Sequence, residues 1–114
     1  MNEADVIRSL AALAQEARLR IFRALIVAGN DGLTPGDLSA ALDITANTLS
    51  FHLKELNNAG LVSQQRQGRN LIYRAEFAAM DRLLGYLTEN CCEGAGCLPA
   101  AAPCKPKSNR RKTA

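Results

Sequence analysis

The chain has 114 residues, of which 47% are apolar and 22% are charged, and it contains no tryptophan. This length suits one domain with a modest core and excludes a large enzyme with a separate cofactor domain. No apolar run approaches the roughly 20 residues of a membrane span, and residues 1–5 lack the basic and apolar regions of a secretory signal. We therefore expect a cytoplasmic protein that has no membrane partner.

The positive charge is concentrated at one end of the sequence. The formal net charge is +3, from 14 Lys and Arg against 11 Asp and Glu. Five of the basic residues lie in residues 105–114, where there is no acid, so residues 1–104 hold 9 basic and 11 acidic side chains. A nucleic-acid surface on the body would therefore be a local patch. The basic tail is expected to be disordered.

Helical signals fill the first 42 residues. Residues 3–28 have helical periodicity in two successive apolar stripes, and the glycines at 29 and 32 interrupt it. Thr34 followed by Pro35 is typical of a helix start, and Asp37 places a negative charge in its first turn. These signals predict a short helix over 35–42. The two stripes consist of Ile7, Leu10 and Leu13, and of Leu19, Phe22, Leu25 and Ile26.

The second half predicts a helix, a hairpin and a last helix. A three-residue turn precedes a helix expected over 46–58, which Gly60 ends in a left-handed conformation. Residues 61–67 and 70–76 indicate two strands around Gly68. A helix over 77–89 carries a broad apolar stripe. The prediction is a mainly α fold with a small β-hairpin (α+β), containing about five helices.

Two short helices, a tight turn and a following hairpin are the order of a winged helix-turn-helix. A helix fits the major groove of DNA, and its outward face needs small polar and basic groups. The candidate DNA-binding residues are Asn47, Thr48, Ser50, His52 and Lys54 on the helix, with Arg66 and Arg69 on the hairpin. For His52, packing inside the motif is the alternative to DNA contact, and Phe51 is expected to pack. The alternative for the whole domain is a helical interaction module whose polar face is merely solvated.

Three segments resemble the ArsR/SmtB family of metalloregulators. Residues 13–22 (LAQEARLRIF) are similar to its opening helix, and residues 45–62, which contain SFHLKEL and AGLV, to its recognition helix. Residues 66–73 (RQGRNLIY) resemble its wing. The resemblance implies a homodimeric repressor that a ligand releases from double-stranded operator DNA, with no cofactor required. The apolar stripe of the last helix, together with the first helix, is the expected dimer interface.

All four cysteines lie in residues 91–104, outside the predicted core. A reducing cytosol keeps such thiols free, and soft thiolates prefer thiophilic ions. Cys91, Cys92 and Cys97 span a short loop with two glycines, whereas Cys104 lies beyond two prolines. Three thiols suit trivalent arsenic, while zinc usually takes a fourth ligand. The resemblance also implies that two other family sites are absent, since residues 33–38 contain no cysteine and the last helix contains no histidine.

We therefore expect a repressor whose inducing ligand is trivalent arsenic held by Cys91, Cys92 and Cys97: arsenite, with antimonite or methylated arsenic as alternatives. Residues 1–90 would form the DNA-binding and dimerisation domain, residues 91–104 the metalloid-binding segment and residues 105–114 the tail. The alternatives are a thiol redox sensor, a zinc- or cadmium-responsive repressor, a metal-buffering protein, and thiols without a role. No catalytic constellation stands out, so an enzyme is not expected.

Overall fold

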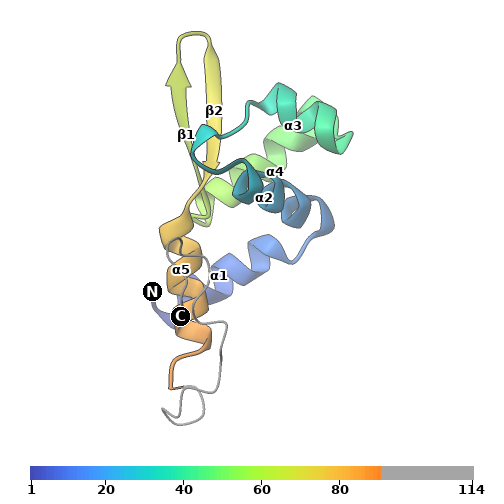
Figure 1. The fold of residues 1–114 in the computed structure, drawn as a ribbon. Helices are drawn as coiled ribbons and strands as arrows, with labels where there is room; N and C mark the ends of the chain where they lie inside the picture. Colours follow the sequence, from blue (N-terminus) through green and yellow to red (C-terminus); the bar gives the residue numbers. More distant parts are fainter. Residues whose placement is uncertain (91–114) are drawn as a thin grey trace.

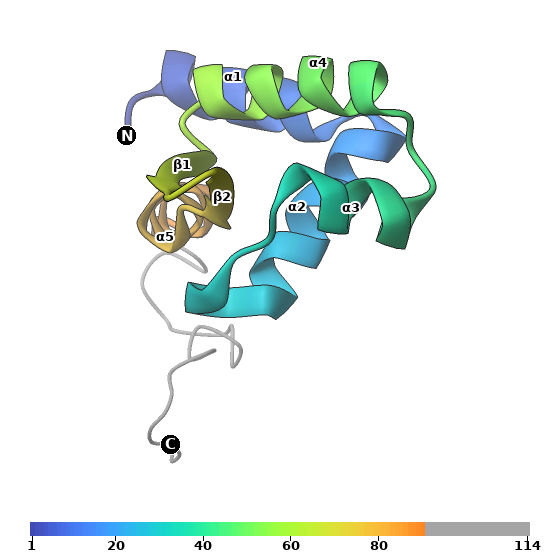
Figure 2. The ribbon, with the colours of Figure 1, turned by 90° about the horizontal axis from the view of Figure 1, so that it is seen from above.

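The computed structural model describes residues 1–90, which form the predicted helices and hairpin (Figure 1). The elements are α1 (Glu3–Leu13), α2 (Glu16–Ala28), a single 3-10 turn (Gly29–Asp31), α3 (Pro35–Leu42), α4 (Ala46–Asn58), β1 (Val62–Gln67), β2 (Asn70–Ala75) and α5 (Phe77–Leu87). Figure 2 shows α4 running along α1, with α2 and α3 beside them. The hairpin and α5 extend in opposite directions from this helical body. The winged helix-turn-helix fold is thus confirmed.

The first helical stretch is divided in two between Leu13 and Glu16. Gln15 has an extended backbone, with φ −147° and ψ 132°, and its side chain accepts a hydrogen bond from the Arg18 amide at 2.9 Å. This side-chain cap satisfies one of the free amides at the start of α2. The break allows α2 to change direction and to cross the body as the central core helix.

Most of the apolar stripe predicted for α1 faces away from the core of the protomer. Val6, Ser9 and Ala12 are buried, whereas Ile7 and Leu10 are 59% and 41% exposed. In α5 the core side chains are Ala79 and Leu83, and the larger apolar residues are exposed: Phe77, Leu84 and Leu87. The core is instead built from α2, α3, α4 and the start of β1. Its fully buried members include Ile21, Leu25, Leu38, Leu49, Leu53, Leu56, Leu61 and Val62.

The helix-turn-helix unit follows its local signals closely. Thr34 accepts a hydrogen bond from the Asp37 amide at 3.0 Å, and the Asp37 carboxylate accepts one from the Thr34 amide at 3.1 Å. This reciprocal capping box fixes the start of α3. Asp43 ends the helix in the left-handed region with φ 57°, and a three-residue turn leads into α4. Gly60 follows α4 with φ 79°, as predicted.

The hairpin has regular antiparallel pairing from Val62 opposite Ala75 to Gln67 opposite Asn70. Its two-residue turn has a positive φ of 63° at Gly68 and none at Arg69, the pattern of a type II′ turn. The far edge of β2 is also paired, because Tyr73 and Leu33 exchange backbone hydrogen bonds of 2.8 and 3.0 Å. This isolated β-bridge at Leu33, in the segment before α3, attaches the wing to the helices.

Candidate nucleic-acid interface

The outward face of α4 carries four exposed side chains in one stripe. Leu49, Leu53 and Leu56 turn into the core. The opposite side of the helix, at positions i, i+4, i+7 and i+11, displays Asn47, Phe51, Lys54 and Asn58. We call these four residues the outward stripe. Ser50 and Thr48 are exposed on its two flanks. Four of the predicted helix residues, Asn47, Thr48, Ser50 and Lys54, are therefore placed where a groove-bound helix would present them.

The start of α4 is electrostatically suited to phosphate. Its first turn contains no acidic residue, and the Thr45 side chain caps no amide, since its hydroxyl instead bonds to that of Thr48 at 3.1 Å. The first amides of a helix carry a partial positive charge and bind phosphate oxygens. The N-terminus of α4 can therefore approach a DNA backbone without competition from its own side chains.

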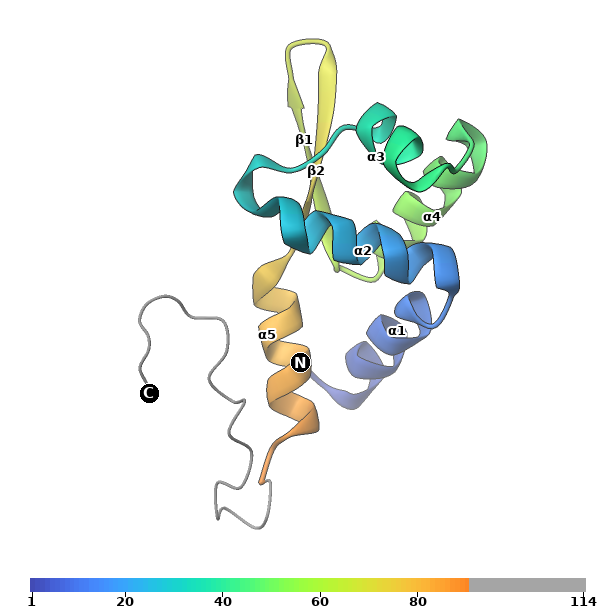
Figure 3. The ribbon, with the colours of Figure 1, turned by 45° about the vertical axis from the view of Figure 1, so that its right-hand side comes forward.

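The wing brings two further cations to the same end of the molecule. Arg66 on β1 and Arg69 in the turn are exposed, and neither forms an ion pair within residues 1–90. Figure 3 shows the tip of the hairpin and the α3–α4 unit at one end of the domain, with α1 and α5 at the other. Apart from His52, the predicted helix and wing residues thus lie toward one end of the domain as a discontinuous polar and basic surface, whose wing residues are suited to flanking contacts.

His52, a candidate for DNA contact in the sequence, does not belong to this surface, and its burial fits the alternative that it packs inside the motif. Its side chain is 7% exposed, and its Nδ1 lies 3.3 Å from Nη1 of Arg18. Burial, and then the charge of Arg18, lower the pKa of His52, while Glu55 opposes them. Arg18 also donates from Nε to the Ala12 carbonyl at 2.7 Å. The contact between Arg18 and His52 is not predicted from the sequence, although both residues lie in the segments that resemble the family.

The structure also corrects the expectation for Phe51. The sequence predicts that this residue packs, but its side chain is 56% exposed. Its only aromatic neighbour among the described residues is His52. The two ring centroids are 5.4 Å apart, and the rings are inclined at 61° in an edge-on arrangement. A large apolar side chain therefore stands within the outward stripe.

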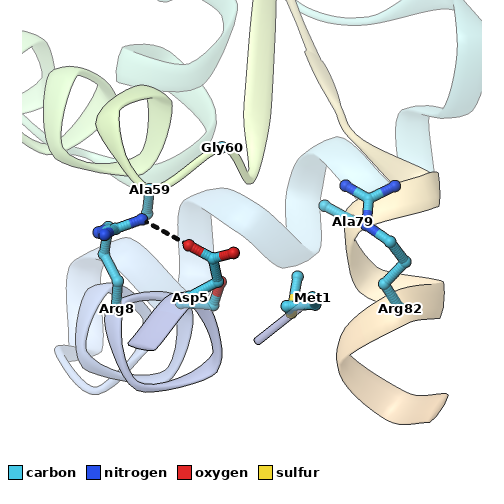
Figure 4. Close-up of a pocket in the computed structure, with 8 residues that line it drawn as sticks. Met1, Asp5, Arg8, Ala59, Gly60, Ala79 and Arg82 are labelled. Carbon is cyan, nitrogen blue, oxygen red and sulfur yellow. Dashed lines mark hydrogen bonds and ion pairs between the residues drawn. The ribbon is translucent and has the colours of Figure 1, made fainter. Parts of the chain in front are cut away.

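A separate cavity of about 240 Å³ lies at the opposite end of the domain (Figure 4). Its wall includes the 3.0 Å ion pair between Asp5 and Arg8, with Arg82 on the far side. Within residues 1–90, no three His, Cys, Asp or Glu side chains gather closely enough to hold a metal ion. The predicted ligands Cys91, Cys92 and Cys97, and also Cys104, lie outside the described residues. No helix of residues 1–90 combines the length and the apolar character that crossing a bilayer requires.

The chain is similar to known DNA-binding proteins. Residues 13–65 match a helix-turn-helix domain family. The transcriptional regulator CmtR of Mycobacterium tuberculosis is 37% identical over 90 residues, which cover 78% of this chain and 73% of CmtR. An ArsR-like transcriptional regulator from Rhodococcus has the same fold, with a TM-score of 0.67 and 28% identity over 74% of this chain and 76% of its own. The chain belongs to the ArsR/SmtB family of winged helix-turn-helix transcriptional regulators.

Three other similar proteins have names that state a ligand, a redox state or an assembly of their own. A putative arsenical resistance operon repressor of Halobacterium salinarum is 40% identical over 67 residues, which cover 59% of this chain and 50% of that protein. Reduced HlyU from Vibrio cholerae is 34% identical with a TM-score of 0.60, over 75% of this chain and 90% of its own. A homodimeric DNA-binding domain from Mycobacterium bovis is 28% identical with a TM-score of 0.61, over 79% and 83%. DNA binding and transcription regulation are therefore the activity of this chain.

Proposed function

We propose that this ArsR/SmtB regulator is a homodimeric repressor that leaves its operator when trivalent arsenic binds Cys91, Cys92 and Cys97. One observation carries the proposal: α5 ends at Leu87 with apolar side chains exposed, and the first thiol follows four residues later. A ligand that gathers these thiols acts directly at the end of the helix that forms the dimer interface. Residues 1–90 bind DNA and dimerise, and residues 91–104 bind the metalloid.

The dimer interface uses α1 and α5, which pack against each other within one protomer. Between 41% and 59% of each large apolar side chain in this set is exposed to water: Ile7, Leu10, Phe77, Leu84 and Leu87. Apolar side chains gathered on two adjacent helices are typical of a protein interface. The homodimeric relative from Mycobacterium bovis supports the same assembly.

Arsenic is favoured by the chemistry of the donors. Three thiolates match the three bonds that trivalent arsenic forms, whereas zinc usually requires a fourth ligand. In a dimer the two copies of α4 must lie one DNA turn apart to occupy successive major grooves. A ligand that binds more tightly to a dimer with another spacing therefore shifts the population away from DNA.

The experiment is a DNA-release titration of the full chain with arsenite, antimonite, zinc and cadmium, together with bound-arsenic stoichiometry. Cys91→Ser, Cys92→Ser and Cys97→Ser are each expected to abolish or strongly weaken the arsenite response while ligand-free DNA binding persists. Cys104→Ser is the matched control and should respond like the unaltered chain. A response that persists in Cys91→Ser or Cys92→Ser contradicts the site. One that needs Cys104 and not Cys97 identifies a different third ligand.

A second candidate is a redox-sensing repressor in which Cys91 or Cys92 forms a disulfide with Cys97. The similarity to HlyU, one solved structure of which is of the reduced protein, supports this candidate. Peroxide would then release the protein from DNA, and a reductant would restore binding. Arsenite would have no effect. The same DNA and the same four variants distinguish the two candidates.

A further inference from the structure

Phe51 occupies the middle of the outward stripe of α4. Asn47 lies one turn before it and Lys54 one turn after it on the same side of the helix. A phenyl ring that is 56% exposed between two polar residues is unfavourable in water. This cost is recovered when a partner covers the ring, and DNA is the partner expected at the stripe if α4 is the reading helix.

The ring of Phe51 is also supported from behind. It meets His52 edge-on with centroids 5.4 Å apart, and His52 is in turn held by Arg18. Edge-to-face pairs of this kind have a preferred geometry and add to the stabilisation from buried area. The ring is therefore directed outward by the buried His52, so less conformational freedom is lost when it makes a contact.

We propose that Phe51 contacts the C5-methyl group of a thymine in the major groove and so selects a T·A pair in each half-site. The inference rests on the proposed use of α4 as the groove-reading helix. A phenyl ring offers no hydrogen bond, and the thymine methyl is the apolar group that the four bases present in the major groove. Phe51 lies in the second turn of α4, the part of a recognition helix that reaches base edges. Asn47 and Lys54 then bond to polar edges on either side.

The test removes the methyl group from DNA and the ring from the protein. An operator is first selected from random duplexes with the full chain, and each thymine is then replaced in turn by uracil, which differs only in that methyl. At the position read by Phe51, the unaltered chain should bind uracil DNA about fourfold more weakly for each methyl removed. Phe51→Ala should bind the thymine and uracil operators equally, and Phe51→Leu should retain part of the preference.

Two control variants keep the interpretation specific. Lys54→Ala should weaken both operators alike and leave their ratio unchanged, and Val27→Ala, which alters an exposed apolar residue on α2, should change neither. A Phe51→Ala chain that keeps the full thymine preference overturns the proposal, whether or not its overall affinity for DNA falls. In that case α4 remains the reading helix. If Asn47→Ala, Lys54→Ala and Phe51→Ala all leave DNA binding unchanged, the DNA-binding face itself is wrong.

Discussion

Nη1 of Arg18 lies 3.3 Å from Nδ1 of His52, and Nε of the same guanidinium donates to the Ala12 carbonyl at 2.7 Å. Arginine has donors only, so Nδ1 has to accept, which requires a neutral imidazole with its proton on Nε2. The lowered pKa of His52 also favours the neutral imidazole. One arginine thus connects the end of α1 to α4 and fixes the protonation state of the buried histidine.

The neutral His52 makes stability depend on pH. Its pKa in the folded state lies below the ordinary value of 6.5, so the unfolded chain takes up the proton first as pH falls. The contribution of His52 is therefore complete above about pH 6.5 and is lost as pH falls below it toward the folded pKa. Urea unfolding of the chain and of His52→Gln, from about pH 8 to about pH 5, should give a stability difference that shrinks or reverses toward low pH. A difference that does not vary with pH would contradict this.

Gly32 is required by the close approach of β2. Its φ is +66°, and an added Cβ would lie 2.6 Å from both the Tyr73 carbonyl oxygen and Ile72 Cγ2. Gly32→Ala should therefore lower the free energy of unfolding by at least about 2 kcal/mol. The matched control is Gly36→Ala inside α3, where the nearest atom is 3.7 Å away. That change should be neutral or stabilise the protein by up to about 1 kcal/mol. Equal destabilisation by both changes in urea unfolding would refute the packing argument.

The helix and the wing should affect DNA binding differently. Arg69→Ala is expected to weaken binding to all sequences and to reduce the slope of log K against log salt by about 1 for each phosphate that is no longer neutralised. Asn47→Ala should instead reduce the preference for the operator over random DNA, by about tenfold. Truncation after Pro103 should leave specific binding largely intact. The opposite result, with truncation abolishing binding and both substitutions silent, would assign DNA binding to the tail.

A charge in the apolar set of α1 and α5 should dissociate the dimer. Leu84 is 53% exposed on α5, so Leu84→Glu disturbs the folded protomer little but buries a carboxylate in an assembled interface. Sedimentation at micromolar concentration should show a dimer for the unaltered chain and a monomer for the variant. Val27→Glu alters a residue that is 81% exposed on α2 and should remain dimeric. A monomeric unaltered chain would exclude the proposed assembly.

The elements with local signals were predictable from the sequence. Thr34, Pro35 and Asp37 mark the start of α3, and Gly60 and Gly68 mark positions of positive φ. Each signal acts within a few residues, so the neighbouring sequence is sufficient to interpret it. The bounds predicted for α3 and α4 therefore agree with the structure.

Features that depend on tertiary contacts were not predictable in the same way. Ile7 and Leu10 form an apolar stripe whether it faces the core or another protein, so periodicity alone could not assign its direction. Positions 51 and 52 differ by about 100° around a helix; the spacing of His52 from Leu49 and Leu56 indicates that it is the inner residue, but its contact with Arg18 has no local signal. The pairing of Leu33 with Tyr73 joins residues forty positions apart and has no local signal.

The attachment of the wing restricts which motions can transmit a signal. Arg74 donates from Nε to the Asn30 carbonyl and from Nη1 to the Gln65 side chain, each at 2.7 Å, beside the Leu33–Tyr73 pairing. The bond to Gln65 lies within the wing, whereas a hinge movement of the wing relative to the segment before α3 would break the Arg74–Asn30 bond and the Leu33–Tyr73 pairing together. The wing and the reading helix are therefore expected to keep their separation within a protomer, so that induction acts by rotating one whole protomer against the other. Distances measured by spin labels between protomers should change with inducer, while those between wing and α4 of one protomer should stay constant.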